Sequence, residues 1–152
     1  MPTIRDSCES DSDQLWGLLE RGLAEYGLRP DRSTTDSDLM DVQASYMEKG
    51  GRFRVLVENG KVIGMCGLYN KGDAVAELRK MYLDPSCKGK GYGKMLIEDA
   101  LEIARKCGFR HIFLETNRVL VEAIGMYKKY GFIEVEQEVS SVRCNCAMAM
   151  DL

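Results

Sequence analysis

Two alternating runs joined by a two-residue turn constrain the fold most strongly. In RFRVLVE (residues 52–58), apolar residues alternate with charged ones, which is the period of a half-buried strand. Asn59-Gly60 follows, and this dipeptide favours the type I′ turn of a β-hairpin. Residues 61–70 are therefore predicted to return as the antiparallel partner strand.

The sheet extends beyond this hairpin. Residues 3–5 are predicted as a short first strand, and a turn at 71–73 leads to a third strand of the meander at 74–83. Asp84-Pro85 ends that strand. Further strands are predicted at residues 111–115, 133–139 and 141–150.

Helical signals separate these strands. Apolar residues recur at helical spacing between polar N-caps and glycine stops. The predicted helices lie within residues 11–27, ending at Gly27; at 36–48, capped by Asp36 or Ser37; from near Gly91 or Gly93 to Gly108; and at 118–130, capped by Asn117.

The order of elements is β-α-α-β-β-β-α-β-α-β-β, with one β-α-β crossover over residues 74–115. This order predicts an α/β fold: a mixed, mostly antiparallel sheet of six or seven strands, flanked by about four helices. A chain of 152 residues is most simply one domain. We therefore expect a single domain over residues 1–152.

Composition argues against several classes of protein. No apolar run approaches the roughly 20 residues that span a bilayer, and the acidic, polar N-terminus does not resemble a signal peptide. We therefore expect a cytoplasmic protein with no membrane partner. The net charge is −3, with 11 acidic and 5 basic residues in the first 50. This pattern is not typical of nucleic-acid binding; it suits an anionic cofactor with a cationic substrate, or simply solvated faces.

Six cysteines and one histidine carry no strong disulfide or metal signal. The cysteine spacing does not resemble a small secreted framework. Cys144 and Cys146 form the sole close pair, and His111 is the sole histidine, which we expect at a surface or sheet edge. We therefore expect no metal site, and reduced, packed thiols.

The segment PSCKGKGYGKML, residues 85–96, combines three glycines and three lysines at the start of a predicted helix. A P-loop requires four residues between its first glycine and Gly-Lys, then Ser or Thr. Here three residues separate Gly89 from Gly93, and Met95 follows the lysine. The dinucleotide motif G-x-G-x-x-G is also absent. Glycines, a helix N-terminus and positive charge still indicate an anion site, most naturally for a pyrophosphate; a flexible basic loop is the alternative.

Residues 77–117 resemble the acetyl-CoA-binding core of the GNAT N-acetyltransferases. The family signature Q/R-x-x-G-x-G/A is similar to Lys88-x-x-Gly91-x-Gly93, which follows the strand ending in MYLDP. Lys88 replaces the usual Arg or Gln and keeps the charge without the planar fork. A second family element, A-x-x-x-Y-x-x-x-G-F, is matched by Ala123, Tyr127, Gly131 and Phe132, and Asn117 matches a common family asparagine.

The resemblance implies that acetyl-CoA is the cofactor. It implies that backbone N–H groups of residues 89–94 hold the pyrophosphate. It also implies a bulged strand whose free amides, near residues 81–83, face the thioester and the pantetheine. The cofactor-binding residues implied in this way are Met81, Tyr82, Leu83, Lys88, Gly89, Lys90, Gly91, Tyr92, Gly93, Lys94 and Asn117.

The same resemblance implies direct transfer of acetyl to an amine, which must be neutral to attack, while the departing thiolate needs a proton. Tyr127 is the candidate proton donor, because a tyrosine pKa near 10 lies close to the roughly 8.5 of a thiol; a core tyrosine is the alternative. Glu77, within an apolar run, is the candidate general base, directly or through water. An exposed carboxylate paired with a nearby cation is the alternative there, and Glu115 is a weaker candidate base.

We therefore expect an acetyl-CoA-dependent N-acetyltransferase that acts on a primary amine of a small molecule or peptide. The aspartates of residues 31–41 favour a cationic acceptor. The competing interpretation is a non-catalytic acyl-CoA-binding or sensing domain with the same fold. The final strand places Cys144, Cys146, Met148 and Met150 on one face, which fits either internal packing or a homodimer.

Overall fold

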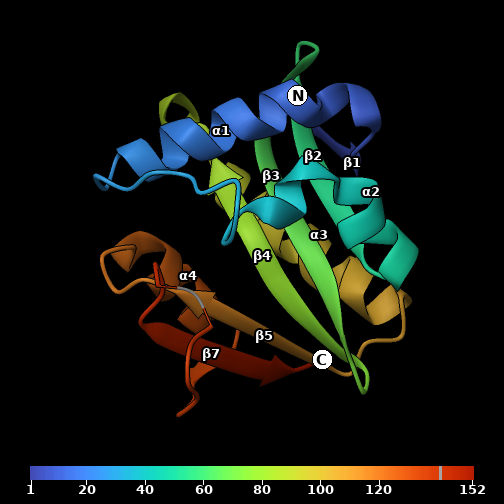
Figure 1. The fold of residues 1–152 in the computed structure, drawn as a ribbon, viewed down its shortest axis with the longest axis vertical. Helices are drawn as coiled ribbons and strands as arrows, with labels where there is room; N and C mark the ends of the chain where they lie inside the picture. The colour runs from blue at the N-terminus through green and yellow to red at the C-terminus, as the bar shows by residue number, and fades with distance from the viewer. Residues whose placement is uncertain (141) are drawn as a thin grey trace.

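The computed structural model describes residues 1–140 and 142–152, and its described strands form one sheet (Figure 1). The strand order across the sheet is β1-β2-β3-β4-β5-β7-β6. Every neighbouring pair is antiparallel except β4 with β5. The prediction of a mixed, mostly antiparallel sheet is therefore confirmed. The strands are β1 (Thr3–Asp6), β2 (Arg52–Glu58), β3 (Lys61–Gly72), β4 (Val75–Leu83), β5 (His111–Thr116), β6 (Ile133–Glu134) and β7 (Cys146–Asp151).

Helices cover both faces of the sheet (Figure 1). They are α1 (Ser12–Ala24), α2 (Val42–Ser45), α3 (Tyr92–Lys106) and α4 (Val121–Lys129). On one face, Leu15, Leu18 and Leu19 of α1 pack in one apolar cluster with Phe53 and Val55 of β2. On the other face, α3 and α4 bury Leu96, Ile97, Ala100, Ala104 and Tyr127 in a second cluster.

None of the helices in residues 1–140 and 142–152 is long and apolar enough to cross a membrane.

The predicted helix at residues 36–48 is wrong in its length. The structure has a 3₁₀ turn at Ser37–Met40, the short α2, and another 3₁₀ turn at Met47–Lys49. Asp41 causes the break, because its backbone leaves the helical region (φ −147°, ψ 86°) and its side chain caps α2 by accepting from the Ala44 N–H. Capping at this point competes with a continuous helix.

The last third of the chain also differs from the prediction. Of the strand expected at 133–139, only Ile133–Glu134 forms β6, and the strand expected at 141–150 begins at Cys146; its first residue, 141, lies outside the described residues. The Val135 N–H still donates to the Ala147 oxygen of β7, whereas Ser140 and Arg143 bond to Glu115 and Asp36, as described below. Asn117 does not cap α4: it accepts from the Val119 N–H, and the helix begins at Val121.

Two irregularities of β4 open the sheet. Arg79 pairs with Gly67 of β3 but Tyr82 pairs with Met65, so Lys80 and Met81 together stand opposite one residue of β3. This is a β-bulge, and Lys80 takes the left-handed backbone conformation there (φ 54°). On its other side, β4 pairs with β5 only as far as Leu78. Beyond that residue the two strands diverge (Figure 1).

Gly51, just before β2, tests how tightly the end of the β2–β3 ladder is packed. A Cβ added there would lie 2.1 Å from the backbone oxygen of Leu68, which belongs to the β2–β3 ladder. We expect Gly51→Ala to lower the free energy of unfolding by about 2 kcal/mol or more, because backbone must move. The measurement is urea unfolding. Gly125→Ala, in α4 with no atom within 4 Å of the new methyl group, is the matched control and should be neutral or slightly stabilising.

Candidate active site

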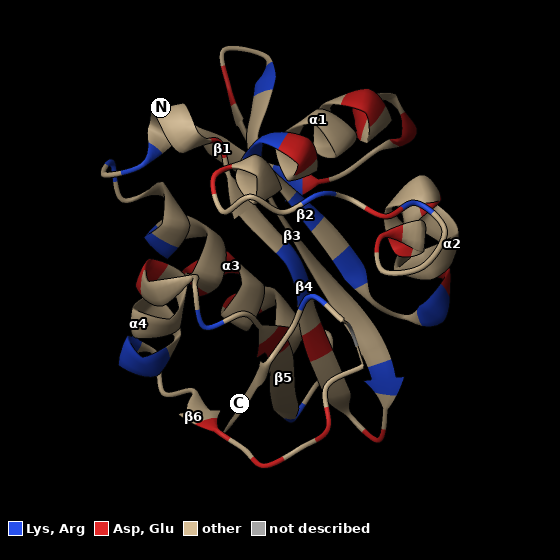
Figure 2. Cartoon of the chain, turned by 60° about the vertical axis from the view of Figure 1, so that its left-hand side comes forward, with Lys and Arg blue, Asp and Glu red and all other residues tan. Residues whose placement is uncertain are grey.

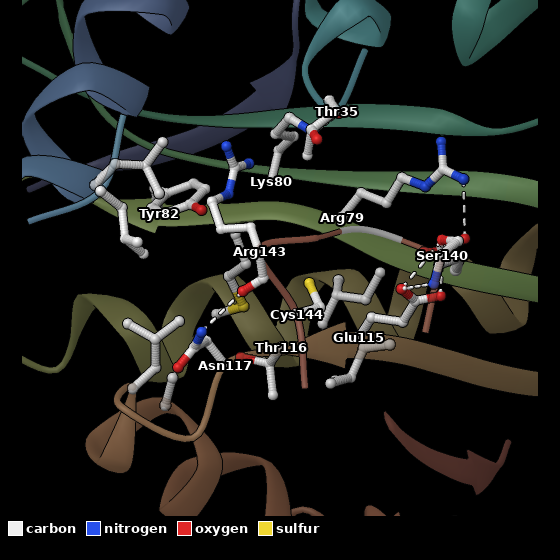
Figure 3. A pocket seen from close by; sticks show the side chains of 18 of the residues that line it. Thr35, Arg79, Lys80, Tyr82, Glu115, Thr116, Asn117, Ser140, Arg143 and Cys144 are labelled. Atoms are coloured by element: carbon white, nitrogen blue, oxygen red, sulfur yellow. Dashed lines mark hydrogen bonds and ion pairs between the residues drawn. The ribbon is translucent and has the colours of Figure 1, made fainter. Parts of the chain in front are cut away.

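A cavity of about 590 Å³ lies where β4 and β5 diverge, and we call it the central cavity (Figure 3). Its walls come from parts of the chain that are distant in sequence. They are residues 77–82 of β4, residues 114–117 at the end of β5, residues 34, 35, 37 and 38 of the loop after α1, residues 140 and 142–144 before β7, Leu23 and Leu28 at and beyond the end of α1, and Leu120, Ala123 and Tyr127 at α4.

Tyr127, predicted as the proton donor, lines the central cavity and is 6% exposed. Its ring packs against Phe132, with centroids 5.6 Å apart. Burial raises the pKa of the Tyr127 hydroxyl above its ordinary value, so the group keeps its proton at physiological pH. Tyr130 donates instead to Glu98 (3.1 Å) and does not line the cavity.

Two predicted carboxylates, Glu77 and Glu115, reach the central cavity from adjacent strands. Glu77 is 6% exposed, and its Oε1 accepts from Arg79 Nη2 at 3.0 Å. It is paired, as the alternative interpretation expected, but it is buried. Glu115 accepts from the backbone N–H of Ser140 at 2.9 Å and from its hydroxyl at 3.1 Å (Figure 3). Glu115 therefore anchors the loop before β7 to β5, which makes it the weaker candidate base.

The glycine-rich loop forms a row of free backbone donors. Gly89 and Gly91 have positive φ (80° and 81°), and Gly91 is the N-cap of α3. Among the described residues, no protein acceptor is bonded to the backbone N–H groups from Gly89 to Lys94. The first N–H to bond within the helix is that of Met95, to Gly91 oxygen. Six free amides at a helix N-terminus fit a pyrophosphate well.

The side chains of this loop are mostly engaged elsewhere. Lys88 Nζ lies 2.6 Å from Glu25 Oε2, at the end of α1, and the Tyr92 hydroxyl donates to Glu58 at 2.8 Å. Lys94 lies 4.0 Å from Glu98 in an exposed pair, and Lys90 is exposed. The loop thus offers mainly its backbone to an anion. The structure brings it beside α4, because a Cβ on Gly93 would lie 3.6 Å from Met126 Sδ.

Residues 79–83 leave one side of β4 unpaired, where the resemblance implied free amides. Met81 and Tyr82 line the central cavity, and Leu83 ends the strand. The Tyr82 ring packs against Gly22 of α1, and burial raises its pKa to about 12. Asn117 also lines the cavity, but its Nδ2 donates to the Arg143 oxygen (2.8 Å), so its amide holds the chain before β7 in place.

A buried ionic network that the sequence analysis missed ties the walls of the cavity together. Asp36 has no exposed surface and accepts from both terminal nitrogens of Arg143, at 2.8 and 2.7 Å. Lys80 Nζ lies 3.2 Å from Asp36, 3.1 Å from Asp38 and 3.3 Å from the Thr35 oxygen. Burial alone would raise the pKa of Asp36, but the Arg143 and backbone hydrogen bonds and the two nearby cations bring it below its ordinary value.

The network changes the expected role of the acidic segment. Asp31 accepts from Ser33 and Thr34, and Asp41 caps α2. Asp36 and Asp38 are paired with Lys80. All four aspartates that were expected to attract a cationic acceptor are therefore satisfied within the chain. Figure 2 shows acidic and basic residues interspersed around β4 and β5, with neither sign dominant.

A sheet that opens between parallel strands, beside a helix N-terminus whose amides have no acceptor within the described residues, fits a protein that binds an extended, phosphate-bearing cofactor. The family model for the acetyltransferase (GNAT) family matches residues 18–132, and the chain belongs to this family. The chain is thus an acetyl-CoA-dependent N-acetyltransferase, and the predictions of family, fold, enzyme class and cofactor are confirmed.

Similar proteins support this assignment. An uncharacterized N-acetyltransferase, YjgM of Escherichia coli K12, is 32% identical over 99% of this chain and 95% of its own length. The N-acetylaspartate synthetase of Xenopus tropicalis is 37% identical over 65% of this chain, but only 37% of its own length is covered. A Staphylococcus aureus Mu50 GNAT acetyltransferase structure matches with TM-score 0.93, 20% identity and 99% of both chains. The PaiA N-acetyltransferase of Thermoplasma acidophilum, in complex with coenzyme A, matches with TM-score 0.81, 21% identity, and 100% and 99% coverage.

The buried network predicts a combined loss of stability and acceptor binding. We expect Asp36→Asn to lower the free energy of unfolding by about 3 kcal/mol or more, because it leaves Arg143 and Lys80 buried without their shared carboxylate. It should also raise KM for an amine acceptor, since the loop at 34–38 loses its tether. Urea unfolding and steady-state kinetics measure the two effects.

Asp99→Asn is the matched control. Asp99 accepts from Arg54 through two nitrogens, at 2.9 and 3.1 Å, but it lies on α3 and does not line the cavity. It should destabilise the fold without changing acceptor KM. Equal KM in all three proteins would show that the Asp36 network has no part in the site.

Proposed function

We propose that this enzyme transfers acetyl directly from acetyl-CoA to a primary amine of a small molecule or peptide, with Tyr127 as general acid and Glu77 as general base. The observation that carries the proposal is that two buried side chains line one cavity, Tyr127 from α4 and Glu77 from β4. The proposed direct transfer uses no cysteine nucleophile, and burial raises the pKa of the Cys66 thiol, which disfavours a thiolate at that residue.

The chain holds the cofactor chiefly through backbone groups. The free N–H groups of residues 89–94 would bind the pyrophosphate, with the exposed Lys90 and Lys94 adding positive charge. The unpaired side of β4 at Met81–Leu83 would donate N–H groups to the pantetheine and to the developing oxyanion. When bound, acetyl-CoA supplies the acetyl thioester.

Glu77 is placed to receive the proton that the amine loses, directly or through water. Arg79 and Lys71 both approach Oε1, at 3.0 and 3.9 Å. Within the described residues no donor contacts Oε2, which leaves that oxygen for the acceptor or a water molecule. The Arg79 contact fixes the carboxylate in one orientation, as a general base requires.

Tyr127 supplies the other proton. The pKa of Tyr127 is raised, so it lies further above the pKa of a thiol than the reference values imply. The hydroxyl therefore acts first as a hydrogen-bond donor and gives up its proton only when the sulfur carries substantial negative charge. The Tyr127 side chain is buried, so the protein largely shields this proton from water.

Tyr127→Phe tests the general acid. We expect kcat to fall about 100-fold or more, while Kd for coenzyme A stays nearly unchanged, because the ring and its packing are retained. Thiol release with a panel of amines and calorimetric titration of coenzyme A measure the two quantities. Tyr130→Phe, outside the cavity, should leave both unaltered. Equal losses of turnover and binding would make Tyr127 a structural residue.

Glu77→Gln tests the general base. The amide keeps the shape of the side chain but cannot take a proton, so kcat should fall about 100- to 10,000-fold. Glu115→Gln is the matched control on the adjacent strand and should have a much smaller effect. The reverse ranking would assign the base to Glu115. A wild-type protein that binds coenzyme A but releases no thiol with any amine would favour the non-catalytic acyl-CoA-binding alternative.

A further inference from the structure

Arg79 differs from the other two cations of the cavity wall, Lys80 and Arg143, in how few of its donors are used. The ammonium group of Lys80 contacts Asp36, Asp38 and the Thr35 oxygen. Arg143 donates to Asp36. Arg79 uses one nitrogen, Nη2, to contact Glu77. Across residues 1–140 and 142–152, its Nε and Nη1 have no acceptor.

The guanidinium group is held in a fixed position. It stacks over the Tyr69 ring, 3.8 Å from the centroid, and the side chain remains 29% exposed at the wall of the central cavity. Stacking and a single carboxylate contact leave the planar fork preorganised. A fixed fork with two free nitrogens is suited to bind a planar anion such as a carboxylate.

Most charges of the cavity wall are already matched by other groups of the chain. Arg143 and Lys80 are paired with Asp36, and Lys80 also contacts Asp38. Glu115 accepts from Ser140. Glu77 and Arg79 are therefore the opposite charges that the described wall leaves to a ligand. A ligand with one amine and one carboxylate suits this pair, which favours a zwitterion.

Building on the function proposed above, we propose that the acceptor is a free α-amino acid whose carboxylate binds Arg79 and whose amine lies at Glu77. The two side chains are two residues apart on β4 and point to the same face. The amine and carboxylate of an α-amino acid are joined to one carbon atom, so adjacent partners suit them. The ammonium group of the amino acid first loses a proton to solvent through Glu77. The N–C bond then forms as the C–S bond breaks; the nitrogen loses its second proton to Glu77, and the sulfur receives a proton from Tyr127, which solvent replaces.

The test compares free L-amino acids with their primary amides as acceptors in the thiol-release assay. The amides lack the carboxylate but keep the side chain. Their amines are also less basic, as in peptides, so chemical reactivity works against the proposal. We expect at least one free amino acid to exceed its amide about 10- to 100-fold in kcat/KM, the range of a charge-assisted hydrogen bond.

Variants separate carboxylate binding from mere support of Glu77. Arg79→Gln should raise KM for the free amino acid and remove most of its preference over the amide. Arg79→Lys should retain part of the preference, because it keeps the charge without the fork. Lys71→Gln is the matched control: Lys71 is the second cation near Glu77 Oε1 but does not line the central cavity. It should leave the preference unchanged.

Each outcome decides a distinct question. Acetylation of amines with no preference for the free acid would overturn the amino-acid inference and leave the proposed function standing. If Arg79→Gln lowers kcat/KM equally for the free amino acid and its amide, Arg79 only positions Glu77. That result would also overturn the amino-acid inference. No turnover with any amine, despite coenzyme A binding, would instead overturn the proposed function.

Discussion

The site depends on the interrupted pairing of β4. A bulge at Lys80 and Met81 shifts the register against β3, and pairing with β5 stops at Leu78. The bulge requires a lysine in the left-handed region, which costs free energy for a residue with a side chain. The buried carboxylate of Asp36 and the partly buried carboxylate of Asp38 hold that lysine. The strained backbone and the ion pairs therefore form one unit.

The bulge and its ion pairs help to place the candidate catalytic side chains where β4 and β5 separate. Because the strands separate, backbone groups of β4 remain free and a cavity reaches from Tyr127 to Glu77. Burial keeps the tyrosine protonated, while Arg79 orients the carboxylate. The proposed pyrophosphate site is independent of this arrangement: within the described residues, the N–H groups of Gly89–Lys94 have no protein acceptor because α3 starts there. The loop at Gly89–Lys94 is shaped by local backbone conformation, whereas the cavity at Tyr127 and Glu77 depends on tertiary contacts.

The quality of the sequence predictions follows the same division. The hairpin at Asn59-Gly60 and the glycine N-terminus of α3 follow from local backbone preferences, and both form as predicted. The helix predicted over 36–48 and the strand predicted over 133–139 did not form as such. In both places a carboxylate takes a nearby backbone N–H: Asp41 caps a new helix, and Glu115 of β5 accepts from Ser140, just beyond the predicted strand.

The sequence alone determined the family, the fold and the cofactor, because the spacing of Lys88, Gly91, Gly93 and Tyr127 encodes a turn, a helix start and a buried helix face within a few dozen residues. The tertiary structure alone decided which charges remain available to a substrate. Asp36, Lys80 and Arg143 are far apart in the chain, so no local pattern shows that they neutralise one another. Only their burial together leaves Arg79 as the cation with free donors at the described cavity wall.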